Sequence, residues 1–151
     1  MNFDVEKMHL YCEAAVAEFA RDHPDEVFYA FAIDSDLLCL NSEEKFVESL
    51  SKYQSNWSKH YSNQNDIHEL RYNTGDWTYQ GFAELNADCG FVSDLYAEHY
   101  DIAMNSEEST ASTTKYARAM NELVEKLKRT KTFDTLKTTP DFQVLWVDHN
   151  Y

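Results

Sequence analysis

The stretch VFYAFAIDSDLLCL (residues 27–40) decides the predicted fold. Residues 27–33 are aromatic, β-branched or small and apolar, a composition typical of a strand, and residues 37–40 form a second apolar run. The DSD between them has turn chemistry. An Asp-x-Asp can also begin a calcium loop, but the glycine and the distant glutamate of such a loop are missing here. The stretch therefore predicts a β-hairpin.

Helices are predicted before and after this hairpin in the sequence, because apolar residues recur in those segments at steps of three and four. Residues 3–21 form the first predicted helix. A second begins at NSEEKF (41–46), where Asn41 or Ser42 can cap and two glutamates lie in the first turn. The same spacing predicts helices over residues 82–100 and 113–129, whereas the polar residues 55–68 predict a long loop.

A final apolar run completes the predicted architecture. FQVLWV (142–147), set off by Pro140, reads as a closing strand. The pattern predicts an α+β fold in a single domain, residues 1–151, with about four helices packed on a small, mainly antiparallel sheet. The predicted strands are residues 27–33, 37–41, part of 69–80, and 142–147.

Composition narrows the class of protein. Hydrophobic residues make up 43% of the chain and aromatic residues 15%, which is typical of a folded globular protein. No apolar run approaches the roughly 20 residues that span a bilayer, and the N-terminal residues do not resemble a secretory signal. Cys12, Cys39 and Cys89 are odd in number and lie in apolar surroundings, so we expect reduced thiols in a cytoplasmic protein.

Charge is the strongest global feature, with 27 acidic against 13 basic side chains and a net charge of −14. Residues 1–114 hold 22 acidic and six basic side chains, whereas residues 115–151 hold five acidic and seven basic ones. Nucleic acids and anionic membranes are repelled by such a surface, and a basic protein is attracted to it. We therefore expect a basic protein partner. Ordinary solubility is the alternative explanation for the charge.

The acidic side chains suggest where that partner binds. Between residues 82 and 114 there are seven acidic residues and no Lys or Arg. On the predicted helix over residues 82–100 the acids fall opposite the apolar stripe. The candidate partner-binding residues are Glu84, Asp88, Asp94, Glu98, Asp101, Glu107 and Glu108. The alternative is an ordinary solvated helix face.

Motifs for chemistry are sparse. The six histidines have no metal-ligand spacing, and a chain with three glycines has no phosphate-binding glycine loop. Cys89 with His99 is not predicted to be a catalytic pair, and His99 is expected to be a hydrogen-bonded core residue. No cofactor, metal or catalytic residue is predicted.

One aromatic segment, LRYNTGDWTYQGF (70–82), offers a possible cleft. Arg71 is the only Lys or Arg between Lys59 and Lys115, and Asp76, Trp77 and Tyr79 follow it. A lone cation among aromatic residues can hold a carboxylate or a phosphate. The structural alternative is a corner in which Arg71 pairs with a carboxylate, Asp76 being the nearest candidate, while the aromatic residues fill the core.

Three segments, in this order, resemble the bacterial family called domain of unknown function 4303. They are FYAFAIDSD (28–36), LRYNTGDWTY (70–79) and FDTLKTTPDFQVLWVD (133–148). The most specific part is the Asp-Trp-x-Tyr piece, whereas Tyr72 stands where the family has Trp. The resemblance implies a helix, a hairpin, further helices and a closing strand, and it transfers no catalytic residue.

The family is similar, in size and in bacterial setting, to immunity proteins that neutralise toxins of contact-dependent growth inhibition and related systems. We therefore expect a cytoplasmic, non-enzymatic immunity protein. Its expected partner is a cognate toxin C-terminal domain, basic and of the nuclease class. The alternative is a small-ligand-binding protein or enzyme that uses the Arg71 segment, and a third possibility is a scaffold protein.

Overall fold

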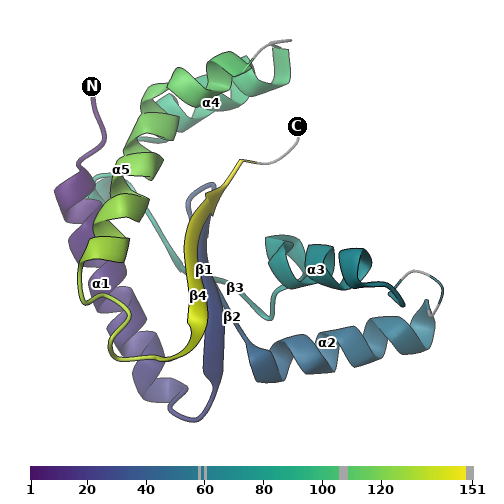
Figure 1. Ribbon diagram of the computed structural model, residues 1–151. Helices are drawn as coiled ribbons and strands as arrows, with labels where there is room; N and C mark the ends of the chain where they lie inside the picture. Colours follow the sequence, from purple (N-terminus) through teal and green to yellow (C-terminus); the bar gives the residue numbers. More distant parts are fainter. Residues whose placement is uncertain (58, 60, 106–108, 149–151) are drawn as a thin grey trace.

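The computed structural model describes residues 1–57, 59, 61–105 and 109–148 (Figure 1). The fold is α+β, with five helices and four strands in the part of the chain so described. The helices are α1 (Val5–Asp22), α2 (Glu43–Asn56), α3 (Gln64–Tyr72), α4 (Ser93–Asn105) and α5 (Lys115–Arg129). The strands are β1 (Val27–Asp34), β2 (Leu37–Ser42), β3 (Tyr79–Glu84) and β4 (Lys137–Val147).

The predicted hairpin forms the centre of a four-stranded sheet with the order β3-β2-β1-β4. β1 and β2 pair antiparallel, with Asp34 opposite Leu37, so the loop contains only Ser35 and Asp36. Ser35 has a positive φ of 60°, as such a tight hairpin loop requires. β2 and β3 are also antiparallel, whereas β4 pairs parallel to β1. The sheet is thus mixed, and only two of its three pairings are antiparallel.

Helices cover both faces of the sheet, which explains why β1 is apolar or aromatic from Val27 to Ile33. In Figure 1, α1 and α5 lie against one face and α2 and α3 against the other. Phe31 and Ile33 point into the core under α1 and α5, and Tyr29 and Ala32 point toward α2 and α3. The first core contains 21 buried residues and the second only seven, so the α2–α3 side is the smaller layer.

The helix predicted over residues 82–100 is wrong in its first half. Residues up to Glu84 belong to β3, and a 3-10 turn, Ala87–Cys89, follows. Gly90 then has a φ of 92°, and a Cβ at this position would lie 2.7 Å from Asp4. This left-handed glycine interrupts helical geometry, so α4 begins only at Ser93. The apolar three- and four-residue spacing therefore came from three different elements.

The loop predicted over residues 55–68 is also partly wrong. α2 continues to Asn56, and α3 begins at Gln64 with Asn63 as its N-cap, the side chain of which accepts from the backbone N–H of Asp66. The segment 69–80, expected to contribute a strand, instead ends α3 and contributes only its last residues to β3. A short helix with a polar surface was mistaken for a loop.

Candidate functional site

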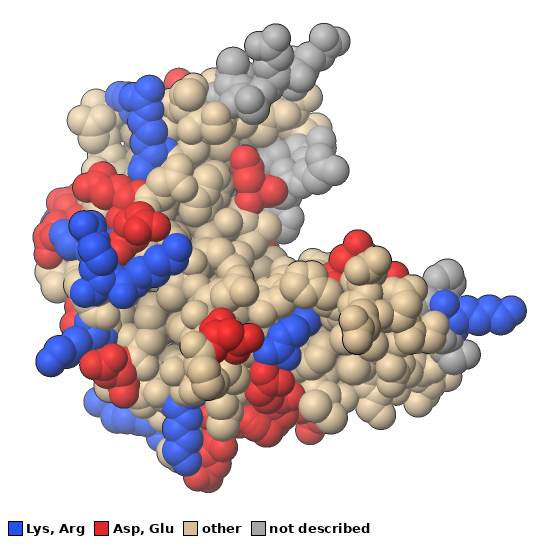
Figure 2. All heavy atoms as spheres, viewed as in Figure 1, with Lys and Arg blue, Asp and Glu red and all other residues tan. Residues whose placement is uncertain are grey.

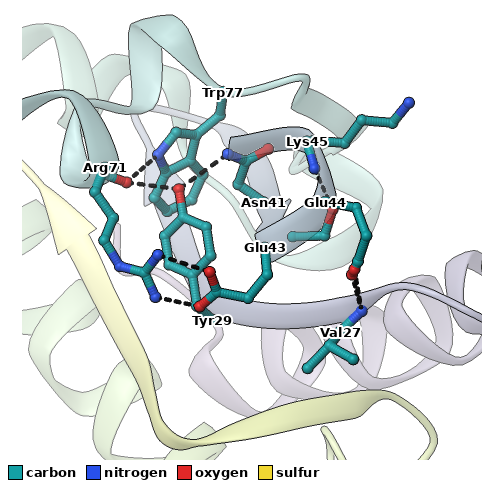
Figure 3. Close-up of polar contacts among 9 residues, drawn as sticks. Val27, Tyr29, Asn41, Glu43, Glu44, Lys45, Arg71 and Trp77 are labelled. Carbon is teal, nitrogen blue, oxygen red and sulfur yellow. Dashed lines mark hydrogen bonds and ion pairs between the residues drawn. The ribbon is translucent and has the colours of Figure 1, made fainter. Parts of the chain in front are cut away.

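Arg71 is the centre of a corner between α2, α3 and the sheet (Figure 3). It lies in the last turn of α3, and its guanidinium makes a two-pronged ion pair with Glu43 in the first turn of α2. The Nη1···Oε2 distance is 3.0 Å, and the Arg71 side chain is only 17% exposed. The guanidinium carbon also stacks 3.8 Å from the centroid of the Tyr29 ring. The hydrogen bonds with Glu43 raise the pKa of Arg71, an effect that burial opposes.

The backbone carbonyl of Arg71 ties the corner to the sheet. It accepts from the Tyr29 hydroxyl at 2.7 Å and from the Trp77 indole N–H at 2.9 Å. Asn41 in turn donates to the Tyr29 hydroxyl and accepts from the backbone N–H of Thr78. We call this set, namely Tyr29, Asn41, Glu43, Arg71 and Trp77, the Arg71 corner. Its polar groups are paired with one another, and burial raises the pKa of Tyr29 to about 12.

The predicted cleft is not assembled. Asp76 does not pair with Arg71: one of its carboxylate oxygens accepts from the Tyr53 hydroxyl and the other from the Asn73 amide. Trp77 packs in the core under α2 and α3, whereas Tyr79 lies on the opposite face of the sheet against Phe19. The Tyr79 hydroxyl donates to Glu26, and burial with this bond raises the pKa of Tyr79. The structural alternative is therefore the better description, with Glu43 as the partner of Arg71.

The predicted acidic face is divided among several elements. Glu84 lies in β3 and Asp88 in the 3-10 turn, both exposed. Asp94, Glu98 and Asp101 do lie along the exposed side of α4, and we call them the α4 acidic stripe. None of these five side chains forms an ion pair with another residue that the structure describes. Glu107 and Glu108 lie outside the described residues.

Positive charge is concentrated elsewhere. The last turn of α5 contains Lys126, Lys128 and Arg129, and Figure 2 shows basic side chains gathered on the side of the molecule where α1 and α5 lie. Two of these cations are matched by acids, since Lys126 pairs with Glu6 and Lys128 with Glu125. The C-terminal bases thus neutralise part of the negative charge locally.

His99 is fully buried and hydrogen-bonded on both sides, as predicted. Its Nδ1 lies 2.7 Å from the Thr114 hydroxyl and its Nε2 lies 2.9 Å from the Asp148 carboxylate. A hydroxyl, an imidazole and a carboxylate in a row have the composition of a catalytic triad. However, the Thr114 hydroxyl is the N-cap of α5, where it accepts from the backbone N–H of Ala117. The trio therefore joins α4, α5 and the end of β4.

The cysteines are free and buried, in agreement with the sequence prediction. Burial raises the pKa of Cys39 to about 11 and raises that of Cys12 still further, which keeps both in the unreactive thiol form. Cys89 exchanges hydrogen bonds with the backbone of Asn86 and closes the 3-10 turn. Among the described residues, no three His, Cys, Asp or Glu side chains are grouped so as to hold a metal ion. None of the helices in this part of the chain has the length and apolar character needed to cross a membrane.

The chain belongs to the family described as Domain of unknown function (DUF4303), whose model matches residues 8–151. No curated protein and no solved structure matches the chain. Two of the three segments that carry the family resemblance meet in the Arg71 corner, because Tyr29 comes from the first and Arg71 and Trp77 from the second. The third segment contains β4, which pairs with β1.

Proposed function

We propose that the chain is an immunity protein that binds the C-terminal domain of a cognate bacterial toxin through an acidic surface. The observation that carries this proposal is the abundance of unneutralised carboxylates. The net charge is −14, and the α4 acidic stripe, with Glu84 and Asp88, forms no ion pair within the described residues. Such a surface accelerates association with a cationic protein and repels nucleic acid.

The proposed toxin is a nuclease of a contact-dependent growth inhibition system or a similar one. A nuclease domain carries cations that fit phosphate groups, so an acidic protein can occupy the same surface. Binding of this kind takes place in the cytoplasm and requires no metal, cofactor or catalytic residue from the inhibitor. A few buried aromatic side chains at the centre of the contact would supply most of the affinity.

The alternative, a small-ligand-binding protein or enzyme centred on Arg71, has less support. A ligand carboxylate would have to displace Glu43, which already engages both terminal nitrogens of the guanidinium. Trp77 and Tyr79 lie on opposite faces of the sheet and cannot line one cleft. The charge of Arg71 is therefore already satisfied within the protein.

Co-expression tests the proposal directly. The probe is the C-terminal domain of the large toxin encoded immediately before this chain in its native genome, expressed with and without the chain in a sensitive host. We expect the chain to restore colony formation and to bind the purified toxin domain. If the well-folded chain neither restored colony formation nor bound the toxin domain, the proposed function would be excluded. Turnover of a small molecule by the purified chain would exclude it as well.

Two variants separate the candidate functions. Arg71→Ala abolishes a ligand site at the corner but leaves toxin inhibition largely intact where the protein still folds. Glu98→Lys with Asp101→Lys should slow toxin association at low salt, and the difference should shrink as salt screens the charges. An unchanged association rate at low salt would show that the α4 acidic stripe is not part of the toxin-binding surface.

A further inference from the structure

β3 is an edge strand in the sheet that the structure describes. It pairs with β2 on one side, and no strand follows it on the other. The N–H and C=O groups on the outer edge of such a strand are available to another chain, unless something covers them. The residues beside this free edge therefore determine what can approach it.

A groove of about 400 Å³ runs beside β3, between that strand and α1. Phe19 closes its floor by contacting the Tyr79 and Phe82 rings at centroid distances of 5.0 and 4.8 Å. Ala14 and Ala15 leave the space open on the helix side, since larger side chains there would fill it. We call this space the β3 groove. It has an apolar floor and room for several side chains.

Two carboxylates form the rim of the β3 groove. Glu18 and Asp22 are exposed, and neither forms an ion pair with another described residue. Their neighbour Arg21 is an exposed cation on the same helix. The opposite side of α1 differs, because its Glu6 pairs with Lys126 of α5. On the side of α1 that faces β3, Glu18 and Asp22 therefore lack the Lys or Arg partner that Glu6 has on the other side.

We propose that the β3 groove is the docking site for an extended basic segment of a partner protein. The segment lies along the outer edge of β3, places apolar side chains on Phe19 and Phe82, and brings a Lys or Arg to Glu18 and Asp22. Charge complementarity selects this occupant, since a second copy of the chain would bring its own net charge of −14. The identification of the partner as a toxin rests on the proposed function, whereas the docking site itself does not.

The geometry of β3 limits how the segment is held. Gly81 has a φ of 71°, and the pairing of β2 with β3 shifts register between Leu38 and Leu40, opposite this kink. A bulge of this kind bends an edge strand away from regular pairing. Main-chain hydrogen bonds to the partner are therefore confined to residues 82–84. The apolar floor and the two carboxylates must supply most of the affinity.

A defined peptide tests the site without any toxin. The ¹⁵N-labelled full chain is titrated with a synthetic Lys-Val peptide, in which Lys and Val take turns at every second position with Thr between them, and amide shifts are mapped. Because every second side chain of an extended strand points the same way, the Lys and the Val can then face the groove together. We expect the largest shifts in β3 and on the exposed side of α1. Two variants should each weaken binding about ten-fold, equivalent to about 1.4 kcal/mol: Ala14→Trp, which fills the groove, and the pair Glu18→Lys with Asp22→Lys.

The matched control is Glu98→Lys with Asp101→Lys, which makes the same change in net charge on α4. Its affinity for the peptide should stay within about three-fold of the parent, because only long-range attraction changes. Thermal unfolding of each variant reports its folding, and Ala14 is exposed, so a Trp there leaves the core intact. Equal weakening by both charge reversals, or shifts spread over the whole surface, would overturn the docking site.

The same variants separate failure of the site from failure of the proposed function. With the toxin domain as ligand, the groove variants should raise the dissociation rate and lose protection, whereas the α4 variants should only slow association. Protection that survives the groove variants would overturn the docking site and leave the immunity function standing. Peptide-induced shifts at the β3 groove, together with no binding of the toxin domain, would overturn the immunity function and leave the docking site standing.

Discussion

The Arg71 corner and the β3 groove both bring carboxylates next to aromatic side chains, but the carboxylate is paired with a cation in the corner and unpaired in the groove. At the corner, Glu43 is paired with Arg71, and the guanidinium stacks on Tyr29. In the groove, Glu18 and Asp22 lie beside Phe19 with no cation from the described residues. A paired carboxylate fixes the position of two helices, whereas an unpaired exposed one remains available to another molecule.

This difference predicts which substitutions change stability and which change binding. Removing one partner of a partly buried ion pair leaves the other without compensation, whereas removing an exposed unpaired charge leaves nothing unsatisfied. Substitutions at the corner should therefore lower the free energy of unfolding. Substitutions at the groove should leave it nearly unchanged.

The largest effect is expected for Arg71→Ala. It leaves the Glu43 carboxylate without its cation and removes the stacking on Tyr29, so we expect a loss of about 2–3 kcal/mol in the free energy of unfolding. Urea unfolding of the single variants and of Arg71→Ala with Glu43→Ala measures the coupling between the two residues. A loss below about 0.5 kcal/mol for Arg71→Ala would show that the corner is not held by this ion pair.

A smaller loss is expected for Tyr29→Phe. This variant keeps the ring under Arg71 but removes the hydroxyl that donates to the Arg71 carbonyl and accepts from Asn41. The Asn41 amide loses an acceptor, while the carbonyl keeps the Trp77 indole, so we expect a loss of about 1–2 kcal/mol at neutral pH. Urea unfolding checks this. An unchanged midpoint would mean that water replaces the hydroxyl.

The same hydroxyl predicts a pH dependence. Burial raises the pKa of Tyr29 to about 12, above the value of about 10 for an unfolded chain. Stability from the neutral hydroxyl is therefore complete below pH 10 and is lost as the pH rises toward 12. The stability gap between the parent and Tyr29→Phe should shrink by about 1 kcal/mol between pH 9 and pH 11. A gap that is constant or grows with pH would contradict this sign.

The sequence was sufficient where structure depends on neighbouring residues. The hairpin is predicted because two apolar runs flank a short turn, and the helices α1, α2 and α5 because their apolar stripes are regular. Capping residues support the prediction only for α2, whose N-cap is Ser42. The N-caps of α1 and α5, Asp4 and Thr114, emerge from the structure. The helix over residues 82–100 failed because periodicity outweighed a local signal. Gly90, which directly follows the NADC segment, is the left-handed C-cap of the 3-10 turn. A glycine at such a position is a common helix-termination signal, and it is the signal in the sequence against one continuous helix over residues 82–100.

The candidate sites depend on contacts between distant residues, which one sequence does not reveal. Arg71 finds its partner 28 residues earlier, in Glu43, although Asp76 is only five residues away. The β3 groove arises where α1 passes a strand that begins 57 residues after the helix ends, at Tyr79 against Asp22. In the sequence, Ala14 and Ala15 look like ordinary helix formers. Their small size matters only because β3 lies opposite them.

The smallest change in stability is expected for Glu18→Gln with Asp22→Asn, which keeps shape and removes charge. Both side chains are exposed and lack an ion pair among the described residues, so the free energy of unfolding should stay within about 0.5 kcal/mol of the parent. Binding of the Lys-Val peptide should nevertheless weaken, by less than in the charge-reversed pair, since attraction is lost but no repulsion is added. If stability instead fell by more than 1 kcal/mol, these carboxylates would serve the fold as Glu43 does, and the contrast between the two regions would disappear.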